Sequence, residues 1–186
     1  MWPWGHLAVG YIIYSLLGRL RWLQRPDAAT TVAVLVGTQF PDLVDKPLAW
    51  ILRALPAGQS LAHSLLVAVP VCVTVLLLFR RWGQSPAGLA FVVGYLSHLP
   101  ADVIYRWLVR GDLEAAFLLW PLFRVEPALP ADPLTYVQIL FGTFVGFLTT
   151  TRGLFYLAGE LLLLLTALFL WARDGYPLVK RLRAVQ

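Results

Sequence analysis

Long apolar runs constrain this chain more than any other feature of its sequence. The runs from Leu61 to Phe79 and from Leu154 to Trp171 have few polar interruptions, and they approach the roughly 20 residues that a helix needs to cross a bilayer. Only 13% of the residues are charged, against roughly a quarter in soluble domains. The sequence therefore excludes a soluble globule and predicts one membrane-embedded, all-α domain over residues 1–186.

Three further segments predict additional spans, which makes a polytopic bundle of about five transmembrane helices. They are Trp4 to Leu20, Ala28 to Phe40, and Pro86 to Leu99 with a helical continuation beyond it. The segment from Leu134 to Thr150 is also apolar, but a sixth crossing would leave the basic C-terminus outside. We therefore predict an interfacial or re-entrant helix there.

Clusters of basic residues predict the orientation of the spans, because cytoplasmic helix ends are enriched in Lys and Arg. Such clusters follow the first span from Arg19 to Arg25, the third span at Arg80 and Arg81, and the last span from Arg173 to Arg183. Placing them in the cytoplasm puts the N-terminus outside and the C-terminus inside. We expect a multi-pass protein of the plasma or inner membrane, with the lipid bilayer and no nucleic acid as its partner, although the net charge is +5.

Ionisable residues in or beside a span are costly and mark function by default. The seven that stand out, among them all three histidines of the chain, are His6, Asp42, Asp45, His63, His98, Asp102 and Glu160. The orientation, derived from Lys and Arg alone, brings the first six to the outer membrane face. Glu160 lies about two turns inside the last span, where we interpret it as a protonated side chain bonded to a neighbouring helix.

The chemistry of this group indicates a metal site. His98 and Asp102 are four residues apart and share a helix face, and mixed His and Asp ligands without thiolates suit Zn²⁺, Mn²⁺ or Fe²⁺. A purely structural polar network is the alternative that stays open, because Asp45 can cap a helix or pair with Lys46, and Asp102 can pair with Arg106.

Four motifs, in this order along the chain, resemble the YdjM-type family of membrane-bound metal-dependent hydrolases. They are Gly5-His6, Gln39-Phe40-Pro41-Asp42-Leu43-Val44-Asp45, Leu61-Ala62-His63-Ser64-Leu65 and Gly94-Tyr95-Leu96-Ser97-His98-x-x-x-Asp102. The resemblance covers a motif-bearing core of residues 4–123, whereas the C-terminal helices of residues 134–172 are not covered.

That family is in turn similar to zinc-dependent phospholipase C and to the zinc nucleases specific for single strands. The resemblance implies that Asp42, His63, His98 and Asp102 hold one metal, and that Asp102 bridges to a second metal held also by His6. Those enzymes bind a further metal through a later His and a His-x-x-x-Glu pair, to which only Tyr156-x-x-x-Glu160 is similar here. We therefore expect one or two ions, with Zn²⁺ ahead of Mn²⁺ and Fe²⁺.

Such a site predicts hydrolysis of a phosphoester, because a bound metal activates water and neutralises charge on the scissile group. Asp102 is a candidate catalytic residue as the bridging ligand, and Asp45 is a candidate general base or additional ligand. Arg106 and, less specifically, Lys46 are candidates for binding a phosphate oxygen. A site at headgroup level favours a phospholipid or a lipid-linked phosphoester as substrate.

The alternative function is a membrane protein that binds or transports metal ions or protons without hydrolysing a substrate. Polar residues gathered between helices also mark ion pathways. A pathway needs polar residues that continue to the other face, however, and the cytoplasmic halves of the spans offer only weak groups such as Ser15 and Thr74. This pattern favours the hydrolase.

Overall fold

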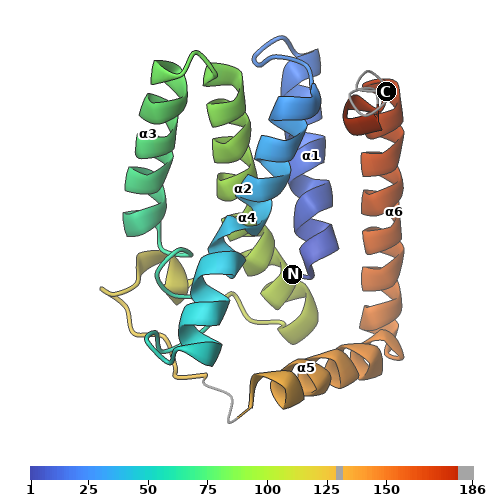
Figure 1. Cartoon of the computed structure of the whole chain (residues 1–186). Coiled ribbons are helices and arrows are strands. Elements are labelled where there is room, and N and C mark those ends of the chain that lie inside the picture. The colour runs from blue at the N-terminus through green and yellow to red at the C-terminus, as the bar shows by residue number, and fades with distance from the viewer. Residues whose placement is uncertain (129–131, 180–186) are drawn as a thin grey trace.

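The computed structural model describes residues 1–128 and 132–179, and all regular structure within these ranges is helical (Figure 1). The elements are α1 (Pro3–Arg19), α2 (Ala28–Lys46), the π-helix η1 (Pro47–Ile51), α3 (Leu65–Arg81), α4 (Ser85–Arg110), the 3₁₀-helix η2 (Ala116–Leu119), α5 (Pro133–Leu148) and α6 (Thr151–Arg173). The predicted all-α class is confirmed. Three basic residues of the C-terminal cluster, Lys180, Arg181 and Arg183, lie outside the described residues.

Helices α1 to α4 pack together, and α2 and α4 make the most extensive contact (Figure 1). Glycine allows this contact. A Cβ on Gly37 would lie 2.2 Å from the carbonyl oxygen of Phe91, and one on Gly94 would lie 2.3 Å from that of Val34. The two backbones therefore cross at the close approach that small residues permit between membrane helices. The crossing sets the distance between the polar ends of α2 and α4.

Internal prolines do not end either of these helices. Helix α2 continues through Pro41 to Lys46, and is therefore longer than the predicted span from Ala28 to Phe40. Helix α4 continues through Pro100 to Arg110, as the prediction of a longer fourth span requires. The site-bearing turns of both helices thus remain helical.

The last two helices have different directions. Helix α5 lies across one end of the bundle, close to the N-terminus, whereas α6 runs alongside α1 (Figure 1). None of the described residues of α5 is buried. The helix itself is confirmed, and its interfacial or re-entrant placement stays a prediction.

Two of the described helices, α4 and α6, are long and apolar enough to cross a membrane by length and composition. Helices α1 and α3 have 17 residues each, which is about 25 Å of helix against a hydrocarbon core of about 30 Å. The remaining three of the five expected spans stay a prediction.

Candidate metal site

Four of the predicted ligands meet in one buried cluster. Asp42 from α2, His63 from the connection before α3, and His98 and Asp102 from α4 each offer one atom, and these atoms lie within 4.8 Å of one another. The Nε2 atoms of the two histidines lie 3.5 and 3.4 Å from Asp102 Oδ2, and 3.5 and 3.9 Å from Asp42 Oδ1. The group can therefore hold a metal ion.

The proton positions on the two histidines follow from partners outside the cluster. His98 Nδ1 lies 2.6 Å from the carbonyl oxygen of Thr38, which only accepts, so Nδ1 carries the proton. His63 Nδ1 lies 2.8 Å from Asp45 Oδ2 and donates to it. In the neutral rings both Nε2 lone pairs then point into the cluster, 3.1 Å apart. Lone pairs and carboxylates gathered in this way repel one another unless a cation lies among them.

The electrostatics of His63 reflect the same concentration of negative charge. Three carboxylates surround this imidazole, with Asp45 Oδ2 2.8 Å from Nδ1 and with Asp42 Oδ1 and Asp102 Oδ2 each 3.5 Å from Nε2. The carboxylates therefore favour a positive charge at this point, which is the condition that a bound cation meets.

Asp45 lies behind His63. Its carboxylate is fully buried and accepts hydrogen bonds from the backbone N–H groups of Ser60 and Ala62 at 2.8 Å, in addition to those from His63. A carboxylate bonded to the far nitrogen of a ligating histidine fixes the orientation of the ring. This arrangement favours a positioning role for Asp45 over the predicted roles of general base or additional ligand.

The two carboxylate oxygens of Asp102 face different partners. Oδ2 lies towards His63 and His98, while Oδ1 lies 3.1 Å from His6 Nε2. The His6 ring stacks on His98 with centroids 3.7 Å apart. These positions place Asp102 between the four-residue cluster and His6, as a bridging carboxylate requires.

Hydrogen-bond donors line the carboxylates on one side. Lys46 Nζ donates to Asp42 Oδ2 at 2.5 Å, Gln59 Nε2 donates to Asp102 Oδ2 at 2.5 Å, and the Met1 amine donates to Asp102 Oδ1. Sequence reasoning missed Gln59, which lies in the connection between η1 and α3. Gln59 has no helical spacing to a predicted ligand, and no predicted ligand is next to it in the sequence. The one available signal was its position four residues before His63.

Arg106 lies one turn beyond Asp102 on α4 and is joined to the site through Gln59. Its guanidinium donates to Gln59 Oε1 and to Glu114 Oε2 and lies over the ring of Phe117 at 5.2 Å. Because Arg has five N–H donors, these contacts leave donors for a further anionic group.

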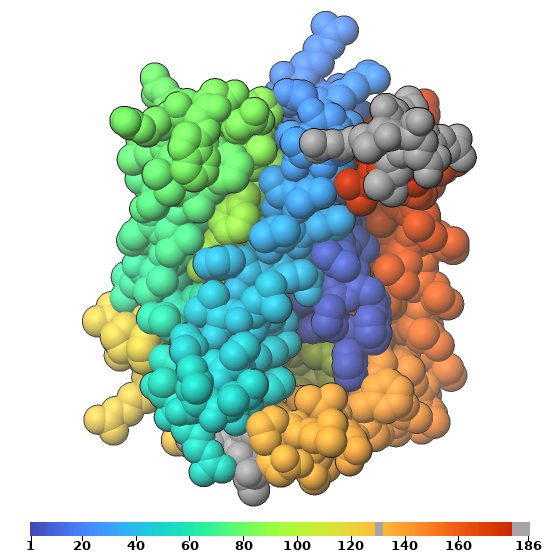
Figure 2. Space-filling view, viewed as in Figure 1, coloured from blue at the N-terminus to red at the C-terminus, as the bar shows by residue number. Residues whose placement is uncertain are grey.

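A cavity of about 630 Å³ adjoins these donors, and we call it the polar cavity. Its lining includes Met1, Lys46, Gln59 and Arg106 from the site and Tyr136, Leu140 and Phe144 from α5. In Figure 2, the first turns of α1 lie in a recess between α2 on one side and α5 and α6 on the other. A substrate in this cavity would reach the carboxylates past Lys46 and Gln59.

The donor set fits a divalent transition metal. Asp42 Oδ1 and both ring nitrogens of His6 are buried and make no hydrogen bond with any described residue, although buried polar atoms normally have partners. Imidazole nitrogens and carboxylate oxygens are the ligands that Zn²⁺, Mn²⁺ and Fe²⁺ accept. Asp42 Oδ1 and His6 Nε2 lie beside the cluster residues, where coordination would satisfy them.

The structure thus brings together His6, Asp42, His63, His98 and Asp102, and places Lys46 and Arg106 at the edge of the same site. Glu160 does not join the cluster. Its carboxyl lies against α1 instead. A Cβ added to Gly5 of α1 would be only 2.7 Å from Glu160 Oε1, which shows how closely the two approach.

Comparison with known proteins identifies a family. The family model described as YdjM inner membrane protein matches residues 1–176. No curated protein and no solved structure matches the chain. The match includes every motif that carries the resemblance, and it extends over the C-terminal helices α5 and α6. The chain therefore belongs to the YdjM inner membrane protein family.

Proposed function

We propose that this protein is a metal-dependent hydrolase that cleaves a phosphoester at the outer face of the membrane. One observation carries the proposal: two histidines, both with Nδ1–H directed outward, aim their Nε2 atoms at two carboxylates within a 4.8 Å cluster. A polar network that served stability alone would pair both Nε2 atoms with hydrogen-bond donors, whereas these two nitrogens lie 3.1 Å from each other.

The ligand set supports one or two ions. Asp42, His63, His98 and Asp102 would hold the first ion, and His6 with the second oxygen of Asp102 would hold another. Zn²⁺ is the ion we favour, ahead of Mn²⁺ and Fe²⁺. When bound, such an ion supplies Lewis acidity, which lowers the pKa of water and offsets charge on a phosphoryl oxygen.

The remaining residues bind and orient. Lys46 and Arg106 line the polar cavity, and their positive charges suit the oxygens of a phosphate group. Asp45 holds His63 in the tautomer that presents Nε2, and the Thr38 carbonyl does the same for His98. Gln59 links Asp102 to Arg106 and so ties the metal site to the phosphate-binding side.

The membrane arrangement belongs to the same proposal. Five spans with the N-terminus outside would place the site at the outer face and the C-terminus in the cytoplasm. The positions of the Lys and Arg clusters support this orientation, and α5 lies across the end of the bundle that carries the site (Figure 1).

Metal analysis combined with hydrolysis assays tests the proposal. The purified protein is expected to contain one or two transition-metal ions per chain and to hydrolyse bis-p-nitrophenyl phosphate or a phospholipid until a chelator removes the metal. Asp102→Asn should lower both metal content and turnover, the latter by about 100-fold or more. Asp112→Asn, at an exposed position after α4, is the matched control and should change neither.

The outcomes separate the candidate functions. Protein that folds but binds no transition metal would overturn the hydrolase proposal. Stoichiometric metal without any chelator-sensitive hydrolysis would instead favour the metal-binding or transporting alternative. Circular dichroism of each variant in detergent establishes that a loss of metal does not come from unfolding.

A further inference from the structure

A second cavity, which we call the apolar cavity, lies between α1, α4 and α6. Its volume is about 830 Å³, and its lining includes Val9, Ile13, Ile104, Leu108 and Leu163. Ile104 and Leu108 are 51% and 42% exposed, so the cavity is reached from the flank of the bundle. This flank faces lipid when α4 and α6 span the membrane. Its walls therefore suit a hydrocarbon chain that enters from the bilayer.

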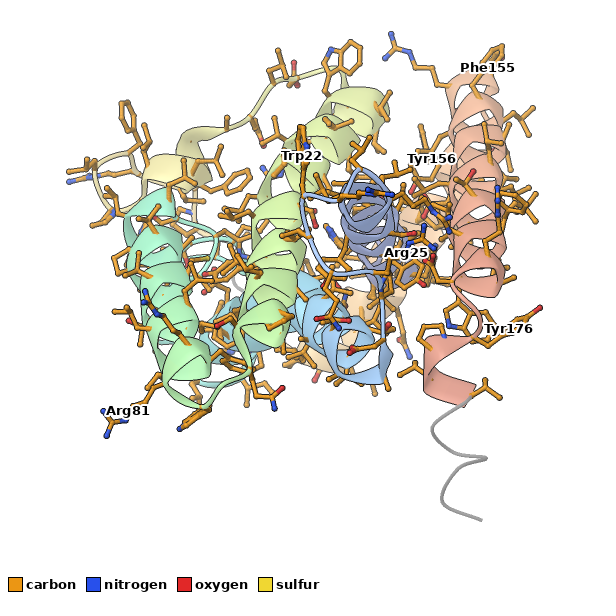
Figure 3. All side chains as sticks on the ribbon, turned by 90° about the horizontal axis from the view of Figure 1, so that it is seen from above. Trp22, Arg25, Arg81, Phe155, Tyr156 and Tyr176 are labelled. Atoms are coloured by element: carbon orange, nitrogen blue, oxygen red, sulfur yellow. The ribbon has the colours of Figure 1, made fainter. Side chains whose placement is uncertain are left out.

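Two polar side chains of α6 face into this cavity. Tyr156 and Glu160 both line it, and each is only 8% exposed. Figure 3 shows Tyr156 on the side of α6 that faces the bundle, whereas Phe155 points away. The Tyr156 hydroxyl and Glu160 Oε1 have no hydrogen-bond partner within residues 1–128 and 132–179. Because an unpaired buried polar group is costly, this pair indicates that the occupant itself carries polar atoms.

The polar pair lies close to the metal site. Glu160 Oε1 packs against Gly5, the residue directly before His6. Met1 lines both cavities, and its amine bonds Asp102. A molecule that lies in the apolar cavity and bonds Glu160 would therefore have its next group beside the metal ligands.

The charges of the polar cavity indicate what that next group is. Four cationic side chains, Lys46, Arg106, Arg110 and Arg124, line the polar cavity together with two acidic ones, Glu114 and Glu126. The excess of positive charge complements a phosphate group. One side of the site thus suits a hydrocarbon chain and the other a phosphate, and this combination is the chemistry of a membrane phospholipid.

We infer that the apolar cavity binds the alkyl chain of an amphiphilic phosphoester drawn from the bilayer, while Tyr156 and Glu160 bond the polar linkage between chain and phosphate. The inference rests on the proposed function and names its substrate class. Tyr156 can donate to an ester carbonyl of the linkage, and the Glu160 carboxyl can accept from a hydroxyl. Both would act as specificity-determining residues that hold the phosphate at the metal ligands.

Photolabelling tests the occupant without any need for activity. The protein is placed in detergent micelles with phosphatidic acid that carries a diazirine in one acyl chain, and labelled residues are mapped by mass spectrometry. Label is expected on Ile104, Leu108 and Leu163, and excess unlabelled phosphatidic acid should displace it more strongly than diacylglycerol with the same chains. Label that spreads evenly over the exposed leucines of α6, such as Leu162 and Leu165, would overturn the inference.

A pair of glycine variants supplies a matched control. Gly159 lines the apolar cavity, and a Cβ there would meet no atom within 4 Å, so Gly159→Leu fills the cavity without disturbing the backbone. Gly142 on α5 has the same free space and does not line that cavity, so Gly142→Leu controls for the added side chain. We expect Gly159→Leu to reduce cavity labelling by about tenfold and Gly142→Leu to leave it unchanged; equal labelling in both would contradict the inference.

Hydrolysis assays then separate this inference from the proposed function. Tyr156→Phe and Glu160→Gln should raise KM for a phospholipid by about five- to tenfold, with metal content and hydrolysis of bis-p-nitrophenyl phosphate unchanged. Equal effects on both substrates would contradict the assigned role. Metal-dependent hydrolysis of the phospholipid that is insensitive to every cavity variant would overturn the lipid site alone, whereas saturable labelling without hydrolysis of either ester would overturn the proposed function alone.

Discussion

At the scale of single residues, the geometry of the cluster depends on bonds made outside it. The Nδ1 atoms of His63 and His98 donate to Asp45 and to the Thr38 carbonyl, so each ring is held in one tautomer and one orientation. Backbone N–H groups of the connection before α3 hold Asp45 in turn. The ligand atoms are therefore positioned before any ion binds.

Replacing the orienting carboxylate tests this reading. Asp45→Asn keeps the size of the side chain but presents an NH₂ group to backbone donors or to His63, and we expect metal affinity to fall by about 10- to 100-fold. Chelator competition with Co²⁺ or Zn²⁺ measures the affinity. Asp132→Asn is the matched control, because Asp132 also accepts a backbone hydrogen bond, from Thr135, at the exposed start of α5.

The same variant distinguishes the positioning role of Asp45 from the role of general base. If Asp45 were a general base, Asp45→Asn would abolish turnover while metal affinity stayed at the wild-type value. Unchanged affinity in a folded variant therefore contradicts the positioning role, and the predicted role of general base would stand in its place.

At the scale of elements, α6 is attached to the bundle by one buried carboxylate at the end remote from the metal site. Asp174, which follows α6, accepts hydrogen bonds from Tyr11, Ser15 and Arg19 of α1 at 2.9, 2.6 and 2.6 Å. At the other end of α6, the apolar cavity lies between this helix and α4. The polar contact thus holds α6 at the end where Leu170 also packs against Tyr11 and Tyr14 of α1.

Removing this acceptor should loosen α6. Asp174→Ala leaves Arg19 without its partner in a partly buried position, and the free energy of unfolding should fall by about 3 kcal/mol. Thermal unfolding in detergent, followed by circular dichroism, measures the loss. Asp112→Ala is the exposed control, and the double variant Asp174→Ala/Arg19→Ala should lose less than the sum of the two single variants. An unchanged melting temperature would show that the contact does not hold α6.

At the scale of the whole molecule, the ends of α4 determine which side of the membrane carries the site. Gln84 caps the start of this helix and Asp112 follows its end, and both are exposed. Asp112 lies about ten residues beyond Asp102, at the same end of the helix as the metal site. Their sidedness therefore reports the orientation of the site directly.

Cysteine labelling in intact cells checks the orientation. In a Cys72→Ala background, Asp112→Cys should react with a membrane-impermeant maleimide from outside, and Gln84→Cys should react only after permeabilisation. Reversed labelling would place the metal site in the cytoplasm. Labelling of both positions from one side would show that α4 does not cross the membrane.

The sequence by itself determined the all-helical class and the approximate helix bounds, because apolar runs, prolines and capping residues act locally. It also indicated that His6, Asp42, His63, His98 and Asp102 gather at one end of the bundle, since alternating spans bring successive helix ends to the same face. The i, i+4 spacing of His98 and Asp102 predicted their shared face for the same local reason.

Only the tertiary structure decided which side chains orient the ligands and what surrounds them. Asp45 lies behind His63, and Gln59 reaches Asp102, because the path of the connection from η1 to α3 brings them there. The apolar cavity exists because α6 packs on α1 but stands away from part of α4. Such contacts join residues far apart in the chain, and they depend on how loops close and helices dock, which no local pattern encodes.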